Sequence, residues 1–494
     1  MARLSRRDFL KLALAGGVVA GCSPVIDTQL RPPLPADAHT IDAQTPTRTV
    51  HLLNRATHGA TPALVAEVET MGVAAWIDQQ LRYEQIDDWR CDLRLRRFDT
   101  IALDEVDLRS FGRLPDKRYV ANELVAATLM RMIYSRRHLY EVLVHFWSDH
   151  FSIYHFKDAC YTLKTVDDRE VIRPHALGYF GDMLRASAHS PAMLVYLDNI
   201  ANEKSHPNEN YAREIMELHT LGVDGGYTEQ DVQEVARCFT GWTINDNHQF
   251  EYRDAWHDKG EKRVLGHVIA AGGGKSDGDR VLDILIEHPS TARYIATKLA
   301  RRFVADDPPA SVVNALVEAW HSSARGTQGG DIRAMMRALF DHPDFWDAPR
   351  KFKRPLELVV SALRSTHASY NGRASLIDRL QDMGQRPFGR QTPDGYPDVA
   401  RAWGSNLAPR WNLALDLVQD SDRLSGVGVP LNQWRDWGGD DPIRYVGRAL
   451  LMRDLTTSEY ETIAGVIGKT RNLSPYDMGQ TIALLLSTPA FQWR

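Results

Sequence analysis

Apolar residues recur at helical spacing in block after block from about Val50 to the C-terminus. Alternation with a period of two residues, which is typical of strands, is almost confined to the segment from Phe250 to Val268, around a polar tip at Asp258–Gly260. No fixed-period repeat is visible along the chain. The pattern therefore predicts a mostly α-helical, multi-helix globular body with one small β-hairpin and no large sheet.

Local signals place several helix boundaries. Thr61 and Pro62 form a cap and first-turn pair, which predicts one helix reaching about Leu81. The block Tyr119–Phe151 reads as two consecutive helices with a break near Ser135. The second of these carries His150 on an apolar stripe, so this histidine is expected to project from a hydrophobic face.

The N-terminal residues have the features of an export signal. Arg6 and Arg7 fit the twin-arginine motif, and the apolar segment Leu12–Val19 is too short to span a bilayer as a mature helix. Small residues then lead to Cys22, which predicts a lipoprotein signal whose cysteine is acylated and anchors the protein in a membrane. The alternative is a plain signal in which Cys22 has no such role. Ser23 resembles the pattern of lipoproteins that proceed to the outer membrane, so we expect the periplasmic side of the cell envelope.

Three segments follow from this reading: residues 1–22 as the signal, 23–47 as a Pro-rich tether, and 48–494 as the helical body. The body is either one unit or two subdomains divided near residues 245–290, where the helical pattern gives way to the hairpin. The net charge of −5 provides no polybasic surface, which argues against nucleic acid as a partner.

Polar and charged residues are densest between Pro207 and Trp242. Asn208 is a good N-cap for a helix that runs from Glu209 until Gly222 stops it. A second helix is expected to begin at once, because Thr228 and Asp231 have the spacing of a capping box. Two helices therefore face each other across a glycine-rich turn.

The helical angle of Glu214 falls on the apolar side of the first helix, so its carboxylate is predicted to point inward, with Asn210 and Glu217 on the same side. With His150 and Asp231, these residues could converge in a cleft that either binds a divalent cation or provides a general acid and base. We take Glu214, Glu217 and His150 as candidate catalytic residues. The candidate binding residues are Asn208, Asn210, Asp231, Arg237, His257 and Asp258.

A purely structural role for the two glutamates is the alternative. In that case Glu214 and Glu217 would form buried ion pairs that lock helices together, with partners among Arg213, Arg237, Arg302 and Arg354. The sequence contains neither the GxSxG nor the HExxH signature, so several common hydrolase classes find no support.

Motifs spread over the whole body resemble those of the bacterial domain-of-unknown-function family numbered eighteen hundred. They are Leu53–Gly59, His145–Phe151, Asn208–Gly222, Gly225–Thr228, Thr240–Trp242, Phe352–Pro355 and Thr392–Pro397. The resemblance implies an exported, α-rich protein. It also implies a partner, since such proteins are often encoded beside an exported family numbered fifteen hundred and one that resembles alkaline phosphatases and sulfatases. It carries no agreed activity or catalytic residues.

Two hypotheses of different class remain open. In the first, the protein is an envelope enzyme, with or without a divalent metal, that acts on a polymer or its fragments through Glu214, Glu217 and His150. In the second, it is a noncatalytic binding or assembly lipoprotein that works with the co-exported partner, and its inward carboxylates are structural.

Overall fold

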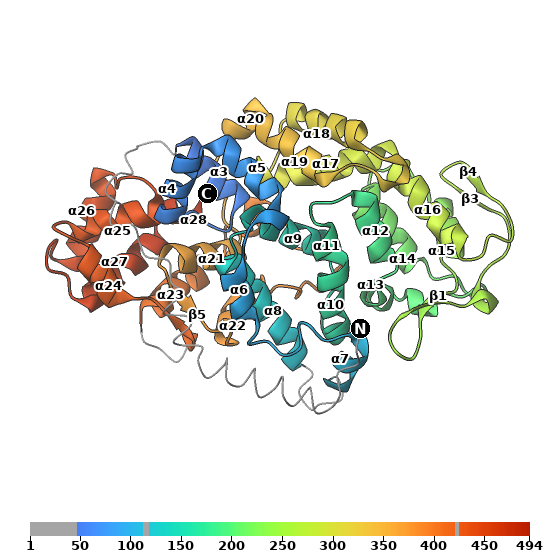
Figure 1. Ribbon diagram of the computed structural model, residues 1–494, viewed down its shortest axis with the longest axis horizontal. Helices are drawn as coiled ribbons and strands as arrows, with labels where there is room; N and C mark the ends of the chain where they lie inside the picture. The colour runs from blue at the N-terminus through green and yellow to red at the C-terminus, as the bar shows by residue number, and fades with distance from the viewer. Residues whose placement is uncertain (1–46, 112–117, 420–423) are drawn as a thin grey trace.

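The computed structural model describes residues 47–111, 118–419 and 424–494. The predicted mostly α-helical class is confirmed: within these ranges the only sheets are three small antiparallel pairs of strands (Figure 1). Arg6, Arg7, Cys22 and the tether up to residue 46 lie outside the described residues. None of the described helices combines the length and the apolar character needed to cross a membrane.

The N-terminal helices show one difference from the sequence-based prediction. The segment from Thr61 to Leu81 forms two helices, α4 (Pro62–Met71) and α5 (Val73–Leu81), because Gly72 between them adopts φ +90° and interrupts the helical path. The neighbouring helices are α3 (Arg48–Ala56), η2 (Tyr83–Gln85), α6 (Trp89–Leu95) and α7 (Glu105–Phe111).

The expected break near Ser135 is confirmed, since α8 (Arg118–Tyr134) ends before it and α9 (His138–His150) begins after it. Short helices follow, with one π-helical turn among them: α10 (Cys160–Asp167), the π turn η3 (Asp168–Ile172), α11 (Arg173–His175), α12 (Phe180–Ala188), α13 (Pro191–Tyr196) and η4 (Asn199–Ala201).

The helix pair in the polar stretch is also present. It consists of α14 (Glu209–Glu214), which continues as the π turn η5 (Ile215–Thr220), and of α15 (Glu229–Cys238). Gly222 ends the first helix with φ +83°, and the capping box of Thr228 and Asp231 begins the second.

The strand prediction was wrong in its pairing. Instead of one hairpin from Phe250 to Val268, two hairpins flank the predicted tip: β1 (Trp242–Ile244) pairs with β2 (Phe250–Tyr252), and β3 (Lys262–Val264) pairs with β4 (His267–Ile269). The second turn is made by Leu265 at φ +49° and Gly266 at φ +82°, the left-handed pair that a tight hairpin requires. A third pair, β5 (Ser369–Tyr370) with β6 (Val427–Gly428), was not predicted.

The remaining elements are helical. The first group is η6 (Asp254–Trp256), α16 (Ser276–Glu287), α17 (Pro289–Phe303), α18 (Ala310–Ser323), η7 (Gly326–Gln328), α19 (Ile332–Asp341) and α20 (Pro343–Trp346). The second group is α21 (Pro355–Ser365), α22 (Ser375–Asp382), η8 (Ala400–Ala402), α23 (Leu407–Val418), α24 (Leu431–Trp437), α25 (Pro442–Leu451), α26 (Thr457–Ile467), α27 (Pro475–Ser487) and α28 (Pro489–Gln492).

Buried apolar side chains form two large clusters. One joins α3–α5 and α9 to the elements through α20, and side chains on both sides of residues 245–290 belong to it. The other joins α8 to α21–α28. Figure 1 shows the bundle α23–α27 at one end of the molecule and the hairpins at the other, with α9 and α21 between them.

A buried ion cluster lies where α17, α21 and the C-terminus meet. Glu357 of α21 is paired with Arg302, with Arg494 at 3.1 Å and with Arg354 at 3.5 Å, and all four side chains are almost fully buried. Because three cations surround one carboxylate, the pKa of Glu357 is held well below its usual range even though burial opposes this. The cluster joins segments that are far apart in the sequence and forms one side of the candidate site.

Candidate functional site

The polar helix is held at both ends as its sequence predicts. Asn208 Oδ1 accepts a hydrogen bond from the Asn210 backbone at 2.9 Å, and the π turn ends with Leu221 N donating to Met216 O at 2.8 Å. A π turn places one extra residue in the helical ring, so side chains after Glu214 are rotated relative to a regular α-helix. Leu218 is only half-buried and lines a cavity.

Glu214 and Glu217 are half-buried, and no arginine or lysine of the described chain pairs with either of them. Arg213 is instead occupied by Glu229 at 2.7 Å and Glu209 at 3.3 Å. Glu217 accepts a hydrogen bond from the Tyr227 hydroxyl at 3.3 Å. Burial, and then the neighbouring charge of Glu217, raises the pKa of Glu214.

Two of the proposed binding residues hold α15 in place. The Asp231 carboxylate accepts the backbone N–H groups of Thr228 at 2.9 Å and Leu265 at 2.7 Å, so it caps the helix and fixes the β3–β4 turn. Arg237 is paired with Asp258 at 2.8 Å. Their polar atoms are therefore used within the fold.

His257 is buried in a second network at the base of the hairpins. Its Nδ1 lies 2.8 Å from Thr240 O, and its Nε2 lies 3.1 Å from Asp277, which is also paired with Lys262 at 2.6 Å. Neither this histidine nor Asp231, Arg237 or Asp258 lines the cavity described next.

A cavity of about 240 Å³ lies against α9 and α17, between the π turn and the buried ion cluster. Four of the sequence segments that carried the family resemblance supply side chains to it, although they are up to about 250 residues apart in the chain. Its lining residues are Phe146, Asp149, His150, Leu218, Tyr294, Lys298, Arg301, Arg302, Arg354, Asp394, Tyr396, Pro397 and Asp398. We call it the central cavity.

Lys298 lines the central cavity without an ion-pair partner in the described chain, although the charges of Asp149, Asp394 and Asp398 act on it from a distance. In the part of the chain that the structure describes, no carboxylate lies within ion-pair distance of it, and its Nζ lies 5.4 Å from the centre of the Tyr294 ring. Burial lowers the pKa of Lys298 to about 8. Arg301 lies about one helical turn from Lys298 on α17. Its Nε donates to the backbone carbonyl of Asp306 at 3.0 Å, and it likewise has no carboxylate partner among the described residues.

Asp149 lines the same cavity at the end of α9. Its Oδ2 lies 3.1 Å from Arg354 and 3.5 Å from His145 Nε2. Burial raises the pKa of Asp149 to about 6, against the opposing effect of Arg354. The loop that covers it passes close by: a Cβ on Gly395, which has φ +72°, would lie 2.1 Å from Asp149 O, so only glycine allows this approach.

His150 lies deeper in the wall. Its Nε2 is 3.1 Å from His219 O, and its Nδ1 has no hydrogen-bond partner in the described structure. Burial, and then Lys298, keeps the pKa of His150 well below its usual value, so the ring is neutral at pH 7. Because the neutral ring has one N–H and uses it to donate to His219 O, its free Nδ1 can only accept a hydrogen bond.

The structure thus brings His150 to the cavity, whereas Glu214 and Glu217 do not line it and lie four residues and one residue before Leu218, which does. The charges of Glu214 and Asp394 both raise the pKa of Tyr196, and the charge of Asp394 also raises the pKa of Glu214. Within the described ranges, no three His, Cys, Asp or Glu side chains are grouped as a metal site would require. Sequence reasoning missed Lys298, Arg301 and Asp149 as candidate site residues.

A family model described as a protein of unknown function, DUF1800, matches residues 51–493. No curated protein and no solved structure matches the chain.

Proposed function

The chain belongs to the DUF1800 family, whose function is unknown, and we propose that it is an envelope lipoprotein enzyme that acts on a small anionic substrate in the central cavity. The observation that carries the proposal is Lys298, a cation without a carboxylate partner in the described structure, which lines the same cavity as Asp149. A cation without an ion-pair partner in a concave site attracts an anionic group, since pairing recovers part of the cost of burying the charge.

Each residue has a chemical role in this proposal. Lys298 and Arg301 bind the anionic group of the substrate. Asp149 exchanges a proton, because the pKa of its carboxyl group, about 6, lies near neutral pH, where an acid–base group works best. His150 stays neutral, and its Nδ1 orients the substrate by accepting a hydrogen bond from it. Glu214, whose pKa is also raised, is the second candidate for proton exchange.

One observation favours the noncatalytic alternative, in which the protein assembles with an exported partner of the fifteen-hundred-and-one family. Asp149 is already paired with Arg354, which is the arrangement of a structural ion pair. If that alternative holds, the cavity binds an anion without changing it.

Anion binding is tested first. The full chain is titrated with inorganic phosphate, sulfate and acetate while its thermal unfolding is followed. At one hundred times the dissociation constant, a bound anion stabilises the protein by about 2.7 kcal/mol. We expect this stabilisation in the parent and in Lys204→Met, which changes an exposed lysine outside the cavity. Equal stabilisation of Lys298→Met would contradict the assignment of the site.

Catalysis is tested separately. The full chain is incubated with cell envelopes from its own source, and the released products are analysed by mass spectrometry. We expect products that disappear with Asp149→Asn while the melting temperature is retained. Anion binding without any product would support the noncatalytic alternative.

Location is tested with the signal residues. We expect Cys22→Ser to release the protein from the membrane fraction and Arg6→Lys with Arg7→Lys to keep it in the cytoplasm. If both variants fractionate like the parent, the proposed location is wrong.

A further inference from the structure

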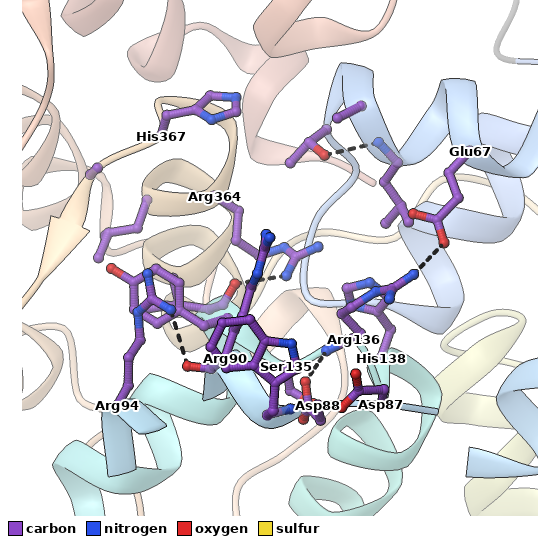
Figure 2. A pocket seen from close by; sticks show the side chains of 18 residues that line it. Glu67, Asp87, Asp88, Arg90, Arg94, Ser135, Arg136, His138, Arg364 and His367 are labelled. Carbon is purple, nitrogen blue, oxygen red and sulfur yellow. Dashed lines mark hydrogen bonds and ion pairs between the residues drawn. The ribbon is translucent and has the colours of Figure 1, made fainter. Parts of the chain in front are cut away.

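A second and larger cavity, of about 440 Å³, lies between α4, the start of α6, the α8–α9 junction and α21 (Figure 2). It shares no lining residue with the central cavity. Its volume is within the range of small-molecule sites. We call it the α4–α21 cavity.

Arg364 of α21 brings a buried positive charge to this cavity. Its Nε donates to Gly59 O at 3.0 Å, and its Nη1 donates to Ile133 O at 2.9 Å. The side chain is buried, yet no carboxylate of the described chain lies within ion-pair distance of it, so its charge is balanced only by neutral carbonyl dipoles. A buried charge without a counter-ion is costly, and a ligand anion would supply one.

Three acidic residues line the cavity and form contacts with other groups. Asp87 is exposed and accepts a hydrogen bond from the Trp89 backbone at 3.2 Å. Asp88 accepts hydrogen bonds from Ser135 Oγ at 2.6 Å and from the Arg136 backbone at 2.9 Å. Glu67 is paired with the Arg136 side chain at 3.2 Å. Figure 2 shows these contacts on the side of the cavity away from His367.

His138 adds a polar group from α9. No hydrogen bond joins its ring to any described residue. The ring lies nearly parallel to that of Trp76, with 6.4 Å between the two ring centres. Burial, and then the charge of Arg364, holds the pKa of His138 well below its usual value. The neutral ring can donate one hydrogen bond to an anion that also meets Arg364.

The rest of the wall is largely apolar and includes Leu64, Ile133, Leu363 and Ala368. We propose that the α4–α21 cavity binds a small carboxylate with an apolar body, whose carboxylate contacts Arg364 and His138 while its body packs on these apolar side chains. This site is separate from the central cavity and does not depend on the function proposed there.

The test uses 4-ethylbenzoate and its neutral amide, 4-ethylbenzamide, in calorimetric titrations of the full chain, with heats from detergent alone subtracted. We expect the carboxylate to bind with one-to-one stoichiometry and the amide to bind at least tenfold more weakly. Arg364→Lys, which keeps the charge but not the planar group, should weaken carboxylate binding at least tenfold. Equal binding of acid and amide would overturn the proposal.

A second variant decides the question if Arg364→Lys fails to fold. Ala63 lines the cavity, whereas Ala66 is exposed on the same helix and does not. We expect Ala63→Phe to fill the cavity and abolish binding, and Ala66→Phe to bind like the parent. Binding that survives Ala63→Phe would place the ligand elsewhere and refute the assignment.

Discussion

Replacing Lys298 by Met should stabilise the protein at pH 7 while removing anion binding. The pKa of Lys298 is lowered from 10.5 to about 8 because burial disfavours its charge. At about 1.36 kcal/mol per pKa unit, this corresponds to at most about 3.4 kcal/mol of lost stability when the lysine is charged. The side chain borders a cavity rather than packed protein, so we discount the gain expected from Lys298→Met to about 2 kcal/mol.

The pH dependence has a definite sign. The folded state holds the Lys298 proton less tightly than the unfolded state, so the parent gains stability as pH rises from about 8 towards 10.5. Below pH 8 the cost of the charge is present in full. The stability advantage of Lys298→Met over the parent should therefore be constant between pH 6 and 7.5. It should shrink as pH rises from about 8 and vanish near pH 10.5.

Urea unfolding of the parent and Lys298→Met at a series of pH values measures this difference directly, because groups common to both proteins cancel. Lys204→Met is the matched control, since it removes an exposed lysine and should change stability by no more than about 0.5 kcal/mol at any pH. A loss of stability in Lys298→Met at pH 7 would refute the reasoning, because it would mean that the charge has a partner in solution.

Three further substitutions test the surrounding structure by urea or thermal unfolding. Glu357→Gln should destabilise the protein by about 3–5 kcal/mol, because it leaves buried arginines without their shared carboxylate; a change under 1 kcal/mol would contradict the cluster. Glu214→Gln should leave stability unchanged or slightly raised, since it removes a partly buried charge that has no cationic partner in the described chain; a large loss would restore the ion-pair alternative. Thr228→Ala should cost about 1 kcal/mol through loss of the α15 cap, and an unchanged midpoint would show that Asp231 alone suffices.

Local signals predicted several helix boundaries correctly. The break at Ser135, the caps at Asn208 and Thr228 and the stop at Gly222 depend on residues within a few positions of each other, and each is present. The same kind of signal was overlooked at Gly72, whose left-handed conformation divides one expected helix into two.

The prediction of a single hairpin was wrong for a non-local reason. Phe250 and Val268 have the alternation of paired strands, but periodicity gives no register, and each segment instead pairs with a neighbour closer in the sequence. Asp258, the predicted tip, is held by Arg237 of α15. This contact joins residues 21 positions apart, so local periodicity does not reveal it.

The candidate site could be predicted only in part, because its chemistry depends on which charges remain unpaired. The sequence shows that Glu214 has arginines nearby, but only the structure shows that Arg213 is taken by Glu229. In the same way nothing local distinguishes Lys298 from any other lysine on a helix. Its cavity is completed by segments about 150 residues before and 100 residues after it.

The net charge of −5 correctly describes the whole chain and still says little about the central cavity. There the carboxylates are shared with arginines, as in the pair of Asp149 with Arg354, while Lys298 and Arg301 form no ion pair within the described structure. An acidic protein does not draw anions to itself over long distances, so the overall field would not accelerate their arrival. Anion recognition here must therefore arise at contact, from desolvated cations in a concave wall, and salt should affect its affinity less than it affects binding to an exposed basic surface.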